Sequence, residues 1–515
     1  MASTDTLLSG SFGTLASLLR AHGAERPDHV ALIDGDHALT YAAFDRRIDR
    51  AAAALQRDGV APGDRVAIVG RTSIDYLVVM LATLRAGAVV VPLAPSSTSD
   101  ALAAMVADAA PRHMFFDSAT DREFGAIDHP RARRVVMESA EFDDWLGATN
   151  AAPVEPTIDP GAPFNIIYSS GTTGVPKGIV QSHAMRWQHI LRGRVTGYAP
   201  DAVTLISTPL YSNTTLVSVV PALAHGGTLV LMAKFDAGRF LSLAEQYRVT
   251  HAMLVPVQYQ RLMDFPDFDR FDLSAFRMKT CTSAPFSAAL KAEVLRRWPG
   301  GLVEIYGMTE GGGTLTLAAH LYPDKLHTVG KPVEGHVVRL IDDAGREVAQ
   351  GEVGEVVGHS PAMMTHYLNH PGKTRDAEWF DADGRRYIRT GDIGRFDADG
   401  FLTLLDRKKD MIISGGFNIY PSDLEAVLMQ HPDVADAAVV GVPSRTWGET
   451  PVGFVTPAGP DAPDAVRVRQ WVADRVGKTQ RLSDLLIVDE LPRSAIGKVL
   501  KRELRDRYLL NHPSE

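Results

Sequence analysis

Residues 168–178, which read YSSGTTGVPKG, combine hydroxyls, glycines and one lysine at a density that could bind a polyphosphate. An apolar, strand-like segment, Phe164–Tyr168, leads into them. Such a loop offers backbone amides, hydroxyl oxygens and an ammonium group to phosphate oxygens. The spacing from Gly171 to Lys177 does not fit the Walker pattern G-x-x-x-x-G-K-[ST]. Composition alone favours a solvated Ser/Gly linker, whereas a lysine and a proline directly behind a strand favour a phosphate-binding loop.

Four further motifs follow in order along the chain. They are YGMTE at 306–310, YIRTGD at 387–392, DRKKD at 406–410 and PRSAIGK at 492–498. Taken singly, such carboxylates and lysines are more often solvated surface groups, and such a tyrosine is more often a core residue. Their joint order favours a shared function.

The five motifs together resemble those of the AMP-forming acyl-CoA synthetases, the superfamily that includes firefly luciferase and the adenylation domains of peptide synthetases. The resemblance covers nearly the whole chain. It implies an α/β fold with a large N-terminal adenylating domain, residues 1–408, and a small mobile α+β C-terminal domain, residues 409–515. It also implies ATP, Mg²⁺ and coenzyme A as the cofactor and co-substrates.

The resemblance assigns roles to single residues. Thr173, Glu310 and Lys498 would be catalytic, with Glu310 as the Mg²⁺ ligand and Lys498 as the lysine that drives adenylation. Tyr306 would stack on adenine, and Lys409 would be the hinge between the domains. The residues assigned to the nucleotide are Ser169, Ser170, Gly171, Thr172, Thr173, Gly174, Lys177, Ser283, Ala284, Pro285, Glu304, Ile305, Tyr306, Gly307, Thr309, Asp392, Arg407 and Lys498.

Coenzyme A and the acyl group have their own expected residues. Gly415, Gly416 and Phe417 resemble the lining of the pantetheine tunnel, where glycines let a ligand approach the backbone closely. Trp447 resembles a residue that flanks this site in some relatives, with packing in the core as an equal alternative. The residues expected in the acyl pocket are His183, Tyr211, Ser212 and Gly330.

Two positions depart from the family pattern. Ser212 stands where relatives commonly carry a histidine, and a serine is smaller and cannot become cationic. This leaves the substrate class open. The S-A-P-F segment at Ser283–Phe286 resembles the family's G-A-P-like adenine loop, with serine in the first place, and the change is expected to be mild because backbone groups act there.

The implied chemistry explains these residue types. A carboxylate is a poor electrophile, so attack on the α-phosphorus of ATP first forms an acyl-adenylate and pyrophosphate. Cationic groups and Mg²⁺ can neutralise the negative charge that gathers there. The thiol of coenzyme A then displaces AMP. The moderate polarity of residues 255–259 fits a medium-chain, cyclic or aromatic acid at least as well as a long fatty acid.

Two other functions remain open. A stand-alone adenylating enzyme that loads a carrier protein would share the pantetheine end of its acceptor with coenzyme A. The chain shows no fused carrier domain, which mildly favours free coenzyme A. A nucleotide-binding protein without catalysis is disfavoured because Glu310, Asp392 and Lys498 are all present.

The segments that must position the N-terminal motifs alternate between strand-like and helical patterns. Thr40 precedes an amphipathic helix whose apolar residues recur every three or four positions, and Gly59 occupies the place of its C-terminal cap. The elements expected next are a strand at Arg65–Val69, a helix at Ser73–Arg85 and a strand at Ala88–Val91 that ends at Pro92. Short apolar strands alternating with helices favour a parallel α/β architecture.

The pattern changes after Lys408. Ser422 and Glu425 have the spacing of a capping box, which predicts that a helix begins there. The other elements expected in this part are an apolar run at Met411–Ser414, strands at Ala435–Val442, Pro451–Thr456 and Leu485–Val488, and a helix at Ala465–Val476. Roughly 100 residues are enough for a separate small domain.

The composition excludes several classes of protein. The chain has 515 residues, 45% of them hydrophobic and 22% charged, which excludes wholesale disorder. A net charge of −9 without a long basic block argues against nucleic acid as a partner. The single cysteine, Cys281, is expected to be a small buried residue and suits a reducing compartment. His183 and His189 are off the spacing of a helical zinc pair.

Membrane insertion and secretion are not expected either. The most apolar stretch, Tyr76–Leu93, is interrupted by Arg85 and Gly87, so it is too short to span a bilayer. The N-terminus lacks the pattern of a signal peptide. We therefore expect a soluble, cytoplasmic enzyme whose partners are small molecules, and a homodimer is compatible with the sequence.

Overall fold

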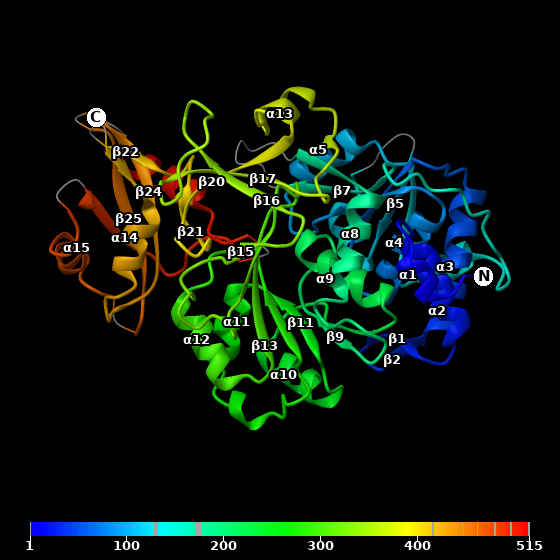
Figure 1. Ribbon diagram of the computed structural model, residues 1–515. Coiled ribbons are helices and arrows are strands. Elements are labelled where there is room, and N and C mark those ends of the chain that lie inside the picture. Colours follow the sequence, from blue (N-terminus) through cyan, green and yellow to red (C-terminus); the bar gives the residue numbers. More distant parts are fainter. Residues whose placement is uncertain are drawn as a thin grey trace. The chain divides into compact units, whose positions relative to one another are not determined.

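The computed structural model describes residues 2–127, 132–169, 177–414, 417–445, 447–460, 462–477, 480–494 and 497–512. It divides into two compact units (Figure 1). The larger comprises Met1–Leu326, Pro332–Val337 and Gly358–Ile388, and the smaller comprises His327–Lys331, Val338–Val357 and Arg389–Glu515. A large N-terminal and a small C-terminal part are confirmed, while a domain boundary at residue 408 stays a prediction.

A seven-stranded sheet carries the loop at 168–178. Its order is β18-β8-β7-β4-β3-β5-β6, and β3 to β7 run parallel while β8 and β18 are antiparallel additions. The strands are β3 (Arg65–Val69), β4 (Val89–Leu93), β5 (His113–Phe116), β6 (Arg133–Val136), β7 (Pro163–Ser169), β8 (Lys177–Ser182) and β18 (His366–Tyr367). The predicted strand Arg65–Val69 is confirmed.

The prediction that Pro92 ends its strand is wrong. Pro92 lies inside β4, opposite Ile68 of β3. The other neighbour, β7, pairs with β4 only at Val90. Pro92 lies between β3 and β7 and forms no described ladder pair with β7, so its missing N–H interrupts no described pairing there.

A nine-stranded sheet, of order β15-β14-β13-β12-β11-β9-β10-β1-β2, carries the adenine-loop and YGMTE segments. Its inner strands from β1 to β13 are parallel, which confirms the expected parallel α/β architecture. The strands are β1 (Val30–Asp34), β2 (His37–Thr40), β9 (Val203–Ile206), β10 (Thr228–Leu231), β11 (His251–Leu254), β12 (Met278–Cys281), β13 (Gly301–Tyr306), β14 (Leu315–Ala318) and β15 (Lys331–Pro332).

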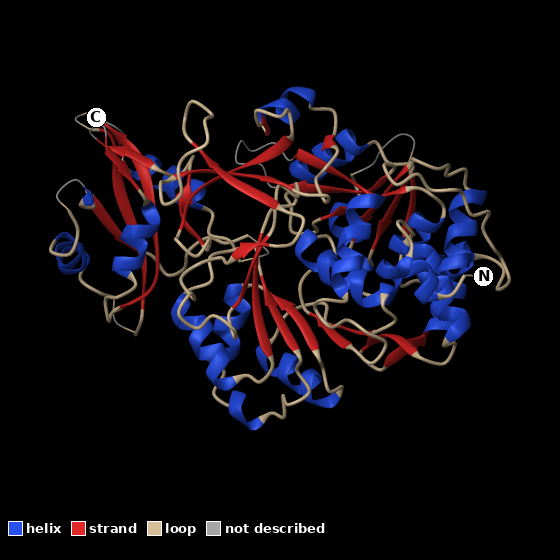
Figure 2. Cartoon of the chain, viewed as in Figure 1, coloured by secondary structure: helices blue, strands red, loops and turns tan. Residues whose placement is uncertain are grey.

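Helices cover these sheets (Figure 2). They are α1 (Thr4–Ser9), α2 (Leu15–Glu25), α3 (Tyr41–Arg57), α4 (Ile74–Arg85), α5 (Ser99–Ala109), α6 (Ser118–Phe124), α7 (Ala140–Leu146), α8 (His183–Gly193), α9 (Asn213–Ala224), α10 (Ala237–Gln246), α11 (Pro256–Met263), α12 (Ala288–Arg297) and α13 (Pro371–Asp376). The predicted helix after Thr40 is α3; the Thr40 hydroxyl caps it, and Gly59 follows it with a φ of 83°.

The main apolar core joins inward-facing residues of both sheets through α2, α3, α4, α8 and α9. Alternate residues of β3 face different cores: Ile68 belongs to this core, while Ala67 packs with α5 on the opposite face. Each fully buried Leu, Ile or Phe contributes about 1.5–3 kcal/mol to folding. Because this shared core holds the two sheets in place, it also fixes the positions from which the loops at their strand ends begin.

Two smaller sheets have the orders β16-β17-β20-β19, with β21 paired to β20, and β23-β22-β25-β24, with β26 paired to β25. The strands are β16 (Val337–Ile341), β17 (Gly354–His359), β19 (Glu378–Phe380), β20 (Arg386–Phe396), β21 (Leu402–Arg407), β22 (Ile412–Ser414), β23 (Phe417–Ile419), β24 (Val434–Ser444), β25 (Gly448–Pro457) and β26 (Asp484–Ile487). The helices of this part are α14 (Pro421–Leu428), α15 (Ala465–Ala473) and α16 (Lys501–Asn511).

The capping box predicted at Ser422 and Glu425 is wrong. Helix α14 begins one residue earlier, at Pro421, and its N-cap Tyr420 makes no side-chain cap. The Ser422 hydroxyl donates to Leu405 O instead. The Glu425 carboxylate accepts from Val439 N and pairs with Lys501 at 2.8 Å. Tertiary partners replaced the local hydrogen bonds that the spacing predicted.

In the described part of the chain, no helix is long and apolar enough to cross a membrane. Cys281 is fully buried, as expected, and burial raises the pKa of its thiol.

Candidate functional site

The two ends of the predicted phosphate loop are neighbours. Ser169 ends β7 and lies opposite Lys177, the first residue of β8. Residues 170–176, which include the predicted Ser170, Gly171, Thr172, Thr173 and Gly174, lie outside the described residues. The Lys177 ammonium lies over the ring of Tyr367, 4.8 Å from its centroid.

Glu310 is held by contacts on its main chain and on its carboxylate. The Tyr367 hydroxyl donates to Glu310 Oε1 at 2.7 Å, and Met364 N donates to Glu310 O at 2.8 Å. Burial and the Glu310 charge raise the pKa of Tyr367, so it stays a donor. No described group donates to the second oxygen, Oε2. The carboxylate is therefore fixed and has one oxygen open to a ligand.

The turn after Glu310 requires glycine. Gly311 has a φ of 74°, and a Cβ there would lie 1.8 Å from Ala362 O. The Ser360 hydroxyl donates to Gly311 O at 2.7 Å. This close approach explains why the YGMTE motif is followed by glycine, and it keeps Glu310 against the segment that carries Tyr367.

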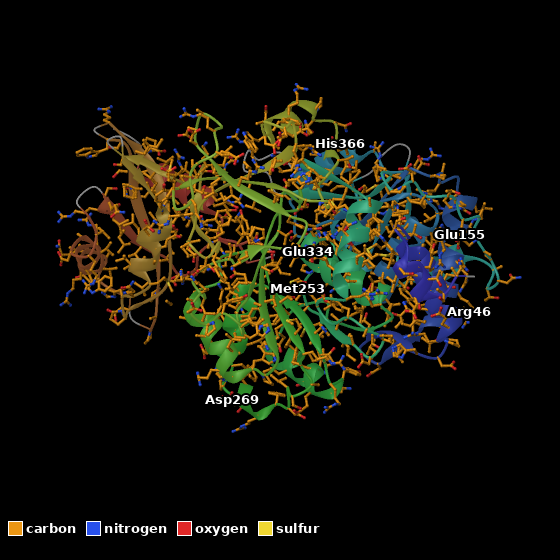
Figure 3. The ribbon with its side chains drawn as sticks, in the orientation of Figure 1. Arg46, Glu155, Met253, Asp269, Glu334 and His366 are labelled. Carbon is orange, nitrogen blue, oxygen red and sulfur yellow. The ribbon has the colours of Figure 1, made fainter. Side chains whose placement is uncertain are left out.

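Tyr367 lies outside every motif and was missed from the sequence. It sits on β18, a strand of two residues next to β8; Figure 3 labels the first of them, His366. So short a strand has no periodic pattern, and a lone tyrosine reads as a core residue. The pairing of β18 with β8 brings Tyr367 beside Lys177, and its hydroxyl reaches Glu310. Tyr367 thus connects these two residues.

The Glu310 side chain has the chemistry of a magnesium ligand. Mg²⁺ prefers oxygen donors and is usually bound by one or two carboxylates together with substrate phosphates and water. No described group of three or more His, Cys, Asp or Glu side chains could hold a metal by itself. An ion at Glu310 would therefore need oxygens from a bound nucleotide, which its open oxygen allows.

The adenine-loop residue Ser283 is strained. Its φ of 82° lies in the left-handed region that favours glycine, so serine there costs about 1–3 kcal/mol of backbone strain. The expectation of a mild change did not include this strain. The Ser283 hydroxyl shares a hydrogen bond of 2.5 Å with Thr214, while Ala284 is half-buried and Pro285 is exposed.

Tyr306 ends β13, and Glu304 and Ile305 precede it on that strand. The Glu304 side chain is buried and forms an ion pair with Lys291. Burial raises the pKa of Glu304 to about 7. The carboxylate thus has a structural partner, so at position 304 the main chain is the part that can face a nucleotide.

Three of the four residues predicted for the acyl pocket lie in the larger unit. His183 begins α8; it is buried, and burial lowers its pKa to about 4, so the imidazole is neutral. Tyr211 is half-buried, and burial raises the pKa of its hydroxyl. The Ser212 hydroxyl caps α9 by accepting from Thr214 N at 3.3 Å. Gly330 lies in the smaller unit, where Leu402 N donates to its carbonyl.

The two residues predicted for the ribose are brought together. Asp392 on β20 lies opposite Arg407 on β21 in the antiparallel ladder. Arg407 Nε is 2.7 Å from Asp392 Oδ1. The carboxylate is nearly buried, so this pair can present a fixed acceptor and donor to the hydroxyls of a ligand.

Lys498 and Lys409, like Asp392 and Arg407, lie in the smaller unit. The Lys498 side chain is exposed, yet desolvation by the protein around it, followed by the charges of Arg407 and Lys409, lowers its pKa to about 8. Lys409 lies in the turn after β21, and its ammonium is 3.4 Å from Asp410. Its role as a hinge stays a prediction.

The coenzyme A segment is described only in part. Gly415 and Gly416 lie outside the described residues, and Phe417 begins β23, which pairs with β22. Trp447 is 58% exposed, so the alternative that it packs in the core is wrong.

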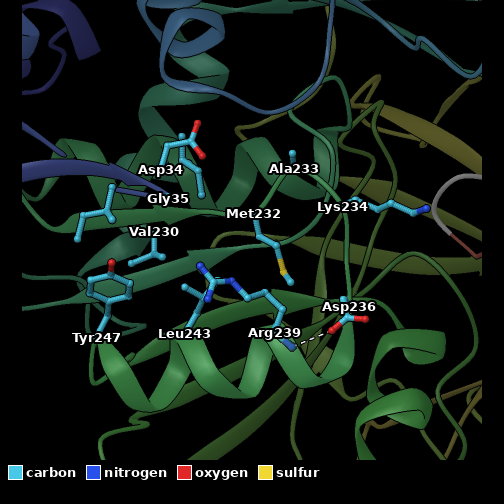
Figure 4. A pocket seen from close by; sticks show the side chains of 12 residues that line it. Asp34, Gly35, Val230, Met232, Ala233, Lys234, Asp236, Arg239, Leu243 and Tyr247 are labelled. Carbon is cyan, nitrogen blue, oxygen red and sulfur yellow. Dashed lines mark hydrogen bonds between the residues drawn. The ribbon is translucent and has the colours of Figure 1, made fainter. Parts of the chain in front are cut away.

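A separate cavity of about 230 Å³ lies at the ends of β1 and β10 beside α10 (Figure 4). Asp34, Lys234 and Arg239 line it, and Arg239 N donates to Asp236 at 2.8 Å. Its lining includes none of the residues assigned to nucleotide, acyl group or coenzyme A.

Comparison with known proteins decides the family. A family model described as AMP-binding enzyme matches residues 19–368, and one described as AMP-binding enzyme C-terminal domain matches residues 423–498. The chain belongs to the AMP-binding enzymes. Among related members of this family is a feruloyl-CoA synthase from Amycolatopsis sp, which is 35% identical over 94% of this chain and 96% of its own.

Other AMP-binding enzymes differ in the acid or the acceptor that they are named for. An indoleacetate–CoA ligase from Aromatoleum aromaticum is 33% identical over 95% of this chain and 97% of its own. A fatty acid–[acyl-carrier-protein] ligase, ScoC, from Streptomyces coeruleorubidus is 32% identical over 98% of each chain. The crystal structure of ATP-bound MatB from Rhodopseudomonas palustris matches with a TM-score of 0.86, 28% identity, and coverage of 96% and 99%.

Proposed function

We propose that this AMP-binding enzyme is an ATP-dependent acyl-CoA synthetase. It activates a carboxylic acid as an acyl-adenylate, releases pyrophosphate, and transfers the acyl group to coenzyme A with release of AMP. Relatives named as CoA ligases, similar along almost the whole chain, support this reaction. The observation that carries it structurally is the Glu310 carboxylate, which Tyr367 holds by one oxygen while the other stays open to a ligand.

In the first half-reaction the substrate carboxylate attacks the α-phosphorus of ATP, and the bond from this phosphorus to the pyrophosphate oxygen breaks. Negative charge gathers on the phosphate oxygens, where the ammonium groups of Lys177 and Lys498 would stabilise it electrostatically. Asp392 and Arg407 would hold the ribose. Positioning supplies most of the rate enhancement in such transfers, so no covalent intermediate with the protein is needed.

We further propose Mg²⁺ as the ion that Glu310 binds. When bound, the ion would neutralise charge on the phosphate oxygens of ATP. The Tyr367 hydroxyl donates to Glu310 Oε1, so Oε2 is the oxygen that would bind the ion. Met364 N and the turn at Gly311 keep the main chain of Glu310 in place.

In the second half-reaction the thiol of coenzyme A attacks the acyl carbon, its proton is released, and the bond to AMP breaks. Gly415–Phe417 are the residues we propose for the pantetheine arm. The exposed Trp447 supports an acceptor surface in this part of the chain.

We propose an aromatic or arylalkanoic acid as the substrate. The feruloyl and indoleacetate relatives are similar to 94% and 95% of the chain, and their acids carry rings of moderate polarity. Ser212 supports a wider pocket than histidine would leave, because its side chain is smaller and points to α9 as the helix cap.

A panel of acids tests the proposal. Ferulic, indoleacetic, medium-chain and long-chain acids would each be mixed with ATP, with or without coenzyme A, while pyrophosphate and acyl-CoA are measured. We expect acid-dependent pyrophosphate release and a coenzyme A-dependent thioester with the aromatic acids. Release that needs a carrier protein and yields no acyl-CoA would favour the carrier-loading alternative, which the ScoC relative supports. Assembly as a homodimer stays a prediction.

A further inference from the structure

A buried polar network lies behind the Glu310 turn. It comprises Asn165 on β7, Gln181 on β8 and Arg186 on α8, whose exposed fractions are 0%, 0% and 1%. Arg186 Nε donates to Asn165 Oδ1 at 2.9 Å, and Arg186 Nη1 lies 3.3 Å from His189 Nδ1. No carboxylate is among the described contacts of the Arg186 guanidinium. Such burial of an uncompensated guanidinium is costly and calls for a specific reason.

The network sets the orientation of the Gln181 amide. Gln181 Oε1 accepts from Asn165 Nδ2 at 2.9 Å and from Arg186 Nη2. Because two donors face this oxygen, the amide cannot turn over without placing its N–H groups against them. Its Nε2 must therefore point away from Arg186.

The donor end of Gln181 reaches the YGMTE motif. Gln181 Nε2 donates to Thr309 O at 2.7 Å and approaches Asn213 Oδ1 at 3.4 Å. The Thr309 carbonyl belongs to the peptide group that joins Thr309 to Glu310. A hydrogen bond there restrains the backbone that aims the Glu310 side chain.

We infer that Gln181, oriented by Arg186 and Asn165, is a positioning residue that aims Glu310 at the metal–nucleotide complex. Tyr367 restrains the carboxylate from one end and Gln181 restrains the preceding peptide from the other. Groups that orient a metal ligand from behind typically change metal affinity or activity about 10- to 100-fold when they are lost. This inference rests on the proposed function, because it takes Glu310 as the ligand.

The variant Gln181→Glu separates positioning from folding. A carboxylate of the same shape would still accept from Asn165 and Arg186 and would compensate the arginine charge, so the fold is retained. Its other oxygen, however, would face Thr309 O as a second acceptor and repel it. Gln56→Glu is the matched control: Gln56 Nε2 also donates to a carbonyl, Val154 O, at 2.7 Å, on the surface of α3.

The readout is Mn²⁺ binding measured by electron paramagnetic resonance in the presence of α,β-methylene-ATP, beside the kcat of acid-dependent ATP–pyrophosphate exchange. For Gln181→Glu we expect Mn²⁺ affinity and kcat to fall about 10-fold or more, with an unchanged or raised unfolding temperature. Gln56→Glu should match the wild type. Wild-type Mn²⁺ affinity in folded Gln181→Glu would overturn the inference.

Arg186→Met gives a second, independent test should Gln181→Glu fold poorly. Replacing a buried charge by an apolar side chain of similar length is often neutral for stability. The Gln181 amide would then lose one of its two orienting donors, so Mn²⁺ affinity should fall in the same direction by a smaller factor. An unchanged affinity would contradict the role of Arg186. If the wild type binds Mn²⁺–nucleotide but none of the tested acids supports ATP–pyrophosphate exchange, the proposed function is contradicted. The positioning role of Gln181 would still stand.

Discussion

Ser283 and Thr214 share a hydrogen bond of 2.5 Å between their hydroxyl oxygens, and Ser283 makes it from a backbone with a φ of 82°. Thr214 lies in the first turn of α9, two residues after the Ser212 cap. The two departures from the family pattern, at Ser283 and Ser212, are therefore neighbours through Thr214. The hydroxyl of Ser283 connects the adenine loop to the helix that begins beside the predicted acyl pocket.

Ser283→Gly and Ser283→Ala separate the strain from the hydrogen bond. Both remove the hydroxyl, but only glycine adopts a positive φ without penalty, so the glycine variant should be more stable by about 1 kcal/mol. Urea unfolding followed by circular dichroism measures the difference. If alanine were as stable as glycine, the strain at Ser283 would be refuted.

Lys498→Ala is expected to impair adenylation and to spare thioester formation. Loss of one group that stabilises transition-state charge costs about 10²–10³ in rate. Pyrophosphate release would be assayed with acid and ATP, and acyl-CoA formation with acyl-adenylate supplied directly. A mutant that fails to use supplied acyl-adenylate would show that the lysine serves both half-reactions.

The pH dependence of adenylation should report the same lysine. Desolvation by the surrounding protein and the neighbouring cations Arg407 and Lys409 lower the pKa of Lys498 to about 8, although its side chain is exposed. Only the protonated ammonium stabilises phosphate charge, so kcat/KM for ATP should be constant below this pKa and fall as the pH rises through it. Lys498→Arg keeps its positive charge throughout this range. Its kcat/KM for ATP should therefore not fall at alkaline pH, even where the variant is slower than the wild type. An identical decline in that variant would assign the titration to another group.

Ser212 is expected to affect both stability and substrate choice. Ser212→Ala removes the cap of α9 and should cost about 1 kcal/mol, whereas Ser212→Asn restores a capping acceptor. Ser212→His should shift kcat/KM towards narrower acids, by different factors across the panel. Equal losses for every acid would mean that Ser212 serves the helix alone.

The sequence predicted those parts of the site that lie in contiguous motifs on regular elements. Asp392 and Arg407 belong to two separate motifs, yet each lies on a strand, β20 or β21. The antiparallel ladder between these strands places the two residues opposite each other. Tyr367 and Gln181 could not be found in this way, because they act through contacts between elements that no local pattern encodes. Ser422 shows the converse: its spacing predicted a capping box, and tertiary bonds to Leu405 replaced it.

The main-chain amide of Lys409 makes no described hydrogen bond. Asp410 N and Met411 N both donate to Arg407 O, at 2.9 and 3.0 Å, whereas no described group accepts from Lys409 N. A proline would therefore remove no described hydrogen bond, and its main effect would be to lock φ near about −65°. Lys409→Pro thus tests the backbone freedom of this residue without removing a described hydrogen bond of the turn.

Lys409→Pro should uncouple the two half-reactions if this residue is the hinge. Lys498 and Gly415–Phe417 lie near opposite ends of residues 409–515, so one fixed arrangement would not present both to the substrate. A few φ/ψ changes at one residue can turn a whole domain. Such a turn must break the bonds that Ser422 makes across Lys409, from its hydroxyl to Leu405 O and from its amide to Asp406 at 2.9 Å.

We expect Lys409→Pro to keep pyrophosphate release close to the wild-type rate and to lose acyl-CoA formation, since the proline would trap the adenylating arrangement. Lys409→Ala is the matched control, because it removes the ammonium and leaves φ free; it should retain both half-reactions. Each reaction would be measured separately, with circular dichroism to verify folding. An equal fall of both in folded Lys409→Pro, or the same uncoupling in Lys409→Ala, would refute a hinge that acts through the backbone of Lys409.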